Sequence, residues 1–169
     1  MAKFNHLGEA QSIRGLAQYT EEVRDRFINL AISYNINIIT GSMPYVKEDG
    51  GLYNVGFLVR RDGSYEMYEK VHVTPDEIKS WGLSGGKMVQ TFDTDCAKIG
   101  ILICYDVEFP ELSRIMADQG MQILFVPFLT DTQNGYSRVR VCAQARAIEN
   151  ECFVVIAGSV GNLPRVHNM

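Results

Sequence analysis

The feature that most limits the possible folds of this chain is an alternation of apolar strand-like segments with helix-like segments. The segment 98–104, KIGILIC, is apolar on both faces, as is typical of a strand covered on both sides. Buried strands are also predicted at 122–128 and 152–158, with helices at 110–120 and 136–150 between them. Such alternation predicts an α/β protein with a mixed sheet, in which ligands gather outside the carboxyl ends of the strands.

The region before these strands predicts one more helix. Its apolar positions share one face of a helical period of about 3.6 residues, and they are Val23, Phe27, Leu30, Ala31 and Tyr34. Thr20 is the predicted N-cap of this helix. The segment 36–40 predicts a short strand, whereas residues 1–16 are only weakly patterned.

A hairpin is predicted in the middle of the chain. Segments 52–60 and 64–70 read as two strands joined by a tight Asp62-Gly63 turn, and 88–92 reads as a further strand. In the helix that Pro110 opens, the residues predicted to face inward are Leu112, Ile115 and Met116. The sequence contains no internal repeat and no Pro/Gly-rich linker, so a single domain over 1–169 is expected.

Charge and composition exclude several classes of partner. The net charge is −4 with no basic run, which disfavours nucleic acid and an anionic membrane. The longest apolar stretch, 123–129, is too short to span a bilayer, and the first residues have no apolar core of a signal peptide. The four cysteines are scattered without CxxC spacing, so we expect free thiols in the cytoplasm and no metal site.

Cys104 is the first candidate for chemistry. It is predicted to end a buried strand and to be followed by a sharp turn into a helix. Such a turn lifts a nucleophile out of the sheet and places backbone N–H groups where an oxyanion develops; here the donor is the N–H of Tyr105. The competing interpretation is that Cys104 is only a small buried hydrophobic residue.

Lys70 is the second candidate, at the end of its own predicted strand in YEKVHVTPDE. A lysine ammonium beside a thiol favours the thiolate and stabilises the oxyanion formed on attack. The competing interpretation is a solvated surface charge. His72, two residues later, supports a rival Cys–His pair, which we weigh well below the Lys70 arrangement.

These two segments resemble the lysine and cysteine motifs of the nitrilase superfamily of carbon–nitrogen hydrolases. YEKVHVTPDE is similar to the lysine motif, and GILICYDVEFPEL is similar to the cysteine motif. The later segments ILFVPF, AQARAIEN and VVIAGSVGN resemble the strand, helix and strand that follow in the family, so the resemblance covers roughly residues 20–165.

The resemblance implies an αββα sandwich, with a mixed sheet flanked by helices, that pairs with a second copy into a homodimer or higher oligomer. It also implies hydrolysis of a nonpeptide carbon–nitrogen bond of an amide, nitrile or carbamoyl substrate without metal or cofactor. Cys104 is then the nucleophile, Lys70 the cation at the oxyanion, and Glu77 a supporting glutamate. Glu77 has an equally good local interpretation, because Thr74-Pro75-Asp76-Glu77 is also a capping box.

The chain departs from the family pattern at both ends. The general-base glutamate of the family follows a first strand that this chain does not show, and the family continues beyond the strand ending near 158. The sequence therefore predicts a truncated member that by itself is inactive. Two alternatives stay open, namely an N-acyltransferase that uses the same Cys–Lys pair and a noncatalytic module that acts only in a complex.

Overall fold

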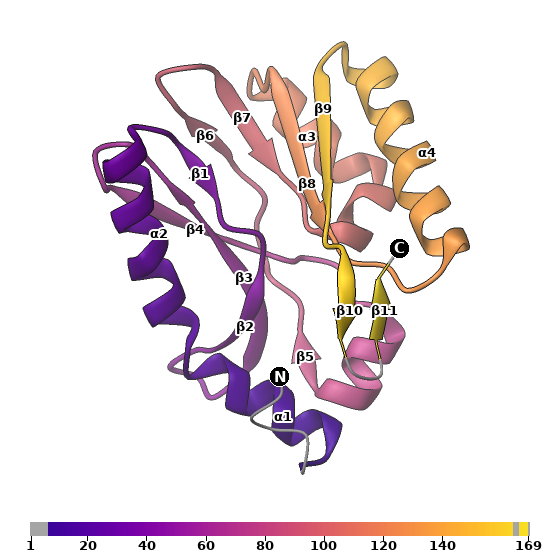
Figure 1. The fold of residues 1–169 in the computed structure, drawn as a ribbon. Coiled ribbons are helices and arrows are strands. Elements are labelled where there is room, and N and C mark those ends of the chain that lie inside the picture. The colour runs from indigo at the N-terminus through magenta and orange to yellow at the C-terminus, as the bar shows by residue number, and fades with distance from the viewer. Residues whose placement is uncertain (1–6, 164–165, 169) are drawn as a thin grey trace. The chain divides into compact units, whose positions relative to one another are not determined.

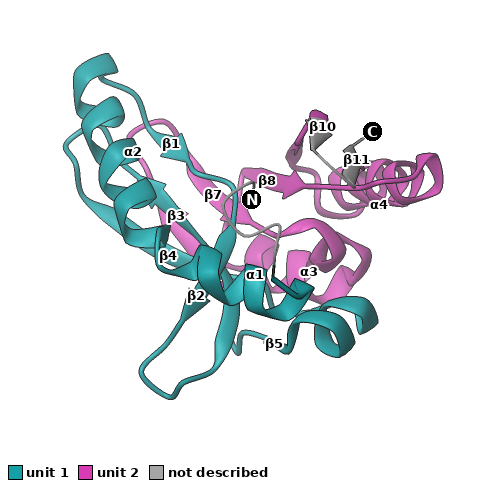
Figure 2. Ribbon diagram, turned by 60° about the horizontal axis from the view of Figure 1, so that its bottom comes forward, with its two compact units in different colours: residues 1–87 teal, residues 88–169 magenta. Residues whose placement is uncertain are grey.

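The computed structural model of the protein describes residues 7–163 and 166–168, with side chains described to residue 161 (Figure 1). It forms two compact units, residues 1–87 and 88–169 (Figure 2). One unit carries a five-stranded sheet and the other a four-stranded sheet. The expectation of a single domain is not tested by this division and stays a prediction.

In its described residues, 7–87, the first unit contains two α-helices, a short π-helical segment and five strands. They are α1 (Glu9–Ala17), α2 (Thr20–Tyr34), β1 (Ile38–Ile39), β2 (Met43–Val46), β3 (Leu52–Val59), β4 (Tyr65–Glu69), η2 (Glu77–Trp81) and β5 (Leu83–Ser84).

Strand β3 is the centre of this sheet and is buried over most of its length. It pairs antiparallel with β1, β2 and β4 and parallel with β5, so the sheet is mixed. Helix α2 covers one face of β3, where Ala31 packs in a cluster with Val55, Phe57 and Val59. At Gly56 an added Cβ would lie 2.0 Å from the Gly41 carbonyl oxygen, so only glycine allows the adjoining chain to approach β3 here.

Over 88–163 and 166–168, the part that the structure describes, the second unit contains two α-helices, a 3₁₀ helix and six strands. They are β6 (Thr91–Asp93), β7 (Lys98–Ile101), η3 (Cys104–Glu108), α3 (Pro110–Asp118), β8 (Ile123–Phe128), α4 (Gln133–Asn150), β9 (Phe153–Gly158), β10 (Gly161–Leu163) and β11 (Val166–Asn168).

The main sheet of this unit has the order β6-β7-β8-β9, with β6 antiparallel to β7 and the other neighbours parallel. Strand β8 buries Leu124, Val126 and Phe128, the alternate residues that share one face of the sheet. Helix α3 packs closely on β7, because a Cβ at Gly100 would lie 2.8 Å from the Met116 sulfur. The predicted α/β class with mixed sheets is therefore confirmed.

Several boundaries differ from the predictions. Tyr19, not Thr20, is the N-cap of α2; Thr20 is buried and its hydroxyl donates to the Pro44 carbonyl at 2.6 Å, a tertiary contact that overrides capping. The predicted strand 98–104 ends at Ile101, and the predicted strand 88–92 is β6, shifted to 91–93. Helix α4 begins at Gln133 instead of Tyr136, because the Thr132 hydroxyl caps it by accepting from the Gly135 N–H.

Two elements of the first unit carry no clear sequence pattern. Helix α1 lies in the weakly patterned leading segment and buries only Ile13 and Ala17, against Leu52 and Leu83. Strand β2 contains Pro44 and forms a second hairpin with β3. Proline is unfavourable in a central strand, so this segment did not predict one.

Two residues of the predicted apolar face of α2, and one residue of α3 predicted to face inward, are exposed. Leu30 and Tyr34 on α2 are 43% and 70% exposed, and Ile115 on α3 is 46% exposed. The apolar residues that share a helical period form a stripe along the helix that is wider than the part of the helix surface covered by the sheet. Only the residues at the centre of this stripe therefore become buried.

Candidate active site

Cys104 occupies a sharp turn in the second unit. It follows the buried residues Leu102 and Ile103, begins η3, and has a left-handed backbone with φ of 51°. A non-glycine residue in this conformation costs about 1–3 kcal/mol and persists only where the surroundings hold it. The predicted turn after the strand is present at Cys104, three residues after β7 ends, whereas the role of Cys104 as nucleophile stays a prediction.

The side chain of Asp106 closes this turn from within. The Ile103 N–H donates to the Asp106 carboxylate at 3.3 Å, and the Asp106 N–H donates to the Ile103 carbonyl at 3.1 Å. Asp106 is fully buried, with 0% exposure. Asp106 was not among the predicted site residues, although an acid two positions after the cysteine, directly behind an apolar strand, is a signal that would have indicated it.

The cysteine itself is partly accessible. Its thiol lies 3.8 Å from the Leu129 carbonyl oxygen, and Tyr105 beside it is half-buried. The Tyr105 ring packs edge-on against Phe109, with 5.0 Å between ring centroids. This contact holds the residue whose N–H is the predicted oxyanion donor.

Lys70 lies in the first unit, directly after β4, and is 2% exposed. Its N–H donates to the Asn54 carbonyl at 2.9 Å, which extends the strand pairing by one residue. Its ammonium lies 2.6 Å from each carboxylate oxygen of Glu77, which is itself buried. Because a solvated lysine would be exposed, the interpretation of Lys70 as an ordinary surface charge is wrong.

Glu77 forms the predicted cap and also contacts Lys70, while its catalytic role stays a prediction. The Thr74 N–H donates to a Glu77 carboxylate oxygen at 2.6 Å, and the Glu77 N–H donates to the Thr74 hydroxyl at 3.2 Å, which is a capping box. The same carboxylate neutralises Lys70. The local cap therefore holds Glu77 in the position from which it orients the lysine.

Two of the other three thiols have a raised pKa. Burial raises the pKa of the Cys142 thiol, with the Glu108 carboxylate adding to the effect. Burial likewise raises the pKa of the Cys152 thiol. Cys96 is exposed and its thiol lies 3.5 Å from the Asp95 carboxylate. A raised pKa lowers the fraction of the reactive thiolate at neutral pH.

The predicted site residues divide between the two units. Lys70, Glu77 and the half-buried His72 belong to the first, and Cys104 and Tyr105 belong to the second. The structure thus describes the lysine–glutamate pair and the cysteine turn each by itself. The pairing of Cys104 with Lys70, or with His72, stays a prediction.

Among the residues that the structure describes, no group of three or more His, Cys, Asp or Glu side chains is placed to hold a metal ion. In the same part of the chain, no helix has the length and apolar character needed to cross a membrane.

Comparisons with known proteins agree with the geometry. The carbon–nitrogen hydrolase family model matches residues 3–168. The chain is 53% identical over 158 residues to a probable hydrolase, YhcX, of Bacillus subtilis, covering 94% of this chain and 31% of that protein. It is 34% identical over 145 residues to the omega-amidase NIT2 of Mus musculus, covering 80% of this chain and 52% of that protein.

The fold is similar to that of solved nitrilase structures. The crystal structure of Saccharomyces cerevisiae Nit3, a nitrilase-superfamily member, superposes with a TM-score of 0.79 at 29% identity, covering 87% of this chain and 54% of that one. The chain thus spans about a third to a half of the length of these relatives. With the family model matching nearly its whole length, this chain belongs to the carbon–nitrogen hydrolases of the nitrilase superfamily.

Proposed function

We propose that the protein hydrolyses the carbon–nitrogen bond of a small amide through a thioester on Cys104. The observation that carries this proposal is the left-handed turn that begins at Cys104, closed by the buried Asp106 carboxylate. An omega-amidase is among the relatives, which favours an amide over a nitrile or carbamoyl substrate.

In the first step the Cys104 thiolate forms a bond to the carbonyl carbon. Negative charge develops on the carbonyl oxygen, where the Tyr105 N–H and the Lys70 ammonium stabilise it. The carbon–nitrogen bond then breaks, the nitrogen takes up the proton that the Cys104 thiol gave to the carboxylate base, and ammonia or an amine leaves. In the second step a water molecule adds to the thioester and releases the carboxylic acid and the free thiol, assisted by a carboxylate base.

Glu77 supports the first step in this scheme. Its carboxylate contacts the Lys70 ammonium through both oxygens and is held by the Thr74 N–H. A lysine that is buried and paired keeps one position, so its charge is directed at the oxyanion without reorganisation during the reaction.

The test of this proposal is the order in which the thiols react. Limiting iodoacetamide followed by peptide mass mapping should label Cys104 before the other three cysteines. Incubation of the full-length protein with a simple aliphatic amide should slow this labelling and leave an acyl mass on Cys104. Cys104→Ala should abolish the adduct, and Cys96→Ala, an exposed thiol, should leave it unchanged. First labelling of Cys96, Cys142 or Cys152 would contradict the assignment.

We also propose that the protein forms a homodimer through the segment 111–119 of α3. Ile115 on this helix is exposed, and so are Val141 and Ile148 on α4, which packs against α3. A two-fold interface would bury such apolar side chains. Light scattering should give a dimer that Ile115→Glu converts to a monomer, whereas Ile32→Glu on α2 should not; a monomeric parent protein would contradict this.

The four free thiols further support a reducing compartment, so we place the protein in the cytoplasm.

A further inference from the structure

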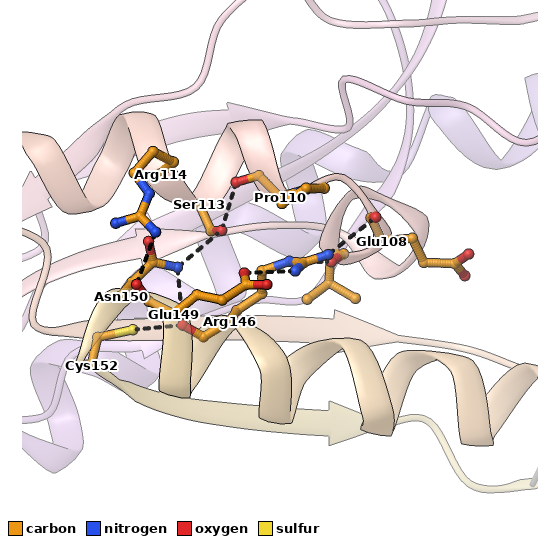
Figure 3. Close-up of polar contacts among 9 residues, drawn as sticks. Glu108, Pro110, Ser113, Arg114, Arg146, Glu149, Asn150 and Cys152 are labelled. Atoms are coloured by element: carbon orange, nitrogen blue, oxygen red, sulfur yellow. Dashed lines mark hydrogen bonds and ion pairs between the residues drawn. The ribbon is translucent and has the colours of Figure 1, made fainter.

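Arg146 is a buried arginine on α4 that the scheme above does not use. The residue is 5% exposed, although arginine is among the residues least often buried. The guanidinium donates to the Val107 carbonyl at 3.0 Å, to the Glu108 carbonyl at 3.2 Å and to the Glu149 carboxylate at 2.8 Å (Figure 3). Each nitrogen of the guanidinium group therefore donates a hydrogen bond.

The two carbonyls belong to the last two residues of η3, whose first residue is Cys104. Asp106 closes the same turn near its beginning, through the Ile103 N–H. Arg146 thus binds the end of the turn and Asp106 binds its start. Carbonyls at the end of a short helix lack partners within the helix, so the arginine satisfies groups that burial would otherwise leave unpaired.

Helix α4 is itself anchored at this point. The Asn150 amide nitrogen donates to the Ser113 hydroxyl at 3.3 Å and to the Arg146 carbonyl at 2.9 Å. The Ser113 hydroxyl donates to the Pro110 carbonyl at 2.9 Å, at the start of α3 (Figure 3). The position of the guanidinium is therefore fixed against the helix that follows the turn.

We propose that Arg146 is a positioning residue for the nucleophile, which rests on the proposed function of Cys104. A left-handed cysteine relaxes to an ordinary backbone unless its neighbours prevent it. By holding Val107 and Glu108, the guanidinium keeps η3 closed, and so keeps the Cys104 thiol and the Tyr105 N–H aimed at the same carbonyl group. A lysine cannot replace Arg146, because its compact ammonium lacks the planar, spread set of N–H donors with which the guanidinium binds two carbonyls and a carboxylate at the same time.

The experiment compares Arg146→Lys and Arg146→Ala with Arg140→Ala, an exposed arginine on the same helix. Circular dichroism and thermal melting select variants that are folded. In the folded Arg146 variants, but not in Arg140→Ala, the rate of iodoacetamide labelling at Cys104 should fall about 10- to 100-fold while labelling of Cys96 stays constant. The reason is that a small misplacement of a reacting group costs up to about 100-fold in rate. In the full-length enzyme kcat should fall by a similar factor with KM nearly unchanged.

Chemical rescue distinguishes positioning from general stabilisation. Dilute guanidinium ion should restore part of the Cys104 labelling rate in Arg146→Ala, whereas methylammonium at the same concentration should not. If neither variant melts as a folded protein, guanidinium should restore both the melting transition and the Cys104 labelling rate in Arg146→Ala; restored melting without recovery of labelling overturns the inference.

If folded Arg146 variants label Cys104 at the wild-type rate, the inference that Arg146 positions Cys104 is also overturned. The proposed function has a separate test. If Cys104 labels as described but the protein hydrolyses no amide, the proposed function is wrong, while the labelling rates still support the positioning role of Arg146.

Discussion

Lys70→Met is expected to lower the free energy of unfolding by about 3–5 kcal/mol, the cost of leaving one partner of a buried ion pair uncompensated. Lys70 and Glu77 are 2% and 8% exposed, and the ammonium lies 2.6 Å from both carboxylate oxygens. Urea denaturation at neutral pH measures this change. Lys79→Met, at an exposed lysine in the same π-helical segment, is the matched control and should stay within about 0.5 kcal/mol.

The double variant Lys70→Met with Glu77→Gln tests whether the loss is electrostatic. Glutamine keeps an oxygen that accepts from the Thr74 N–H, so the cap survives while the buried charge disappears. Most of the stability lost in Lys70→Met should therefore return. If the double variant is as unstable as the sum of the two single variants, the pair is not coupled and the contact carries no energy.

Glu77→Gln is expected to reduce turnover of an amide by the full-length enzyme by up to about 10²- to 10³-fold, the loss typical when one group that stabilises an oxyanion is removed. The capping contact to Thr74 survives this change, but the Lys70 ammonium loses the carboxylate charge that it contacts. The Lys70 ammonium would then be held less firmly in position and would stabilise the oxyanion less. Steady-state kinetics, together with a melting curve to confirm folding, provides the measurement.

Asp76→Asn is the matched control for this variant, because Asp76 is the exposed neighbouring carboxylate in the same turn. It should leave kcat within a factor of about two, as expected for a surface substitution. Equal activity of Glu77→Gln and the parent enzyme would remove Glu77 from the mechanism and reduce it to a helix cap.

The sequence by itself determined the elements whose patterns are local. The strands near 123–128 and 153–158 follow from short apolar runs between helices, and the hairpin turn follows from Asp62-Gly63, whose glycine has φ of 88°. The capping box at Thr74 and Glu77 was also readable, because it joins groups three residues apart.

The resemblance to a family, in turn, was carried by two short motifs around Lys70 and Cys104. These motifs indicated the candidate residues and the chemistry, and the family match confirms the family they point to. They did not indicate that Lys70 is buried, because a strand-end lysine next to Glu69 has the same local pattern when it is exposed.

Only the tertiary structure decided the contacts that join distant segments. Thr20 is not the N-cap of α2, because its hydroxyl donates to the Pro44 carbonyl instead. Ile115 is exposed because the sheet covers only part of the apolar stripe of α3. Arg146 reaches Val107 across 39 positions of the chain. Local patterns report what a residue prefers within a few neighbours, whereas the burial of a charge depends on which distant groups fold over it and satisfy its hydrogen bonds.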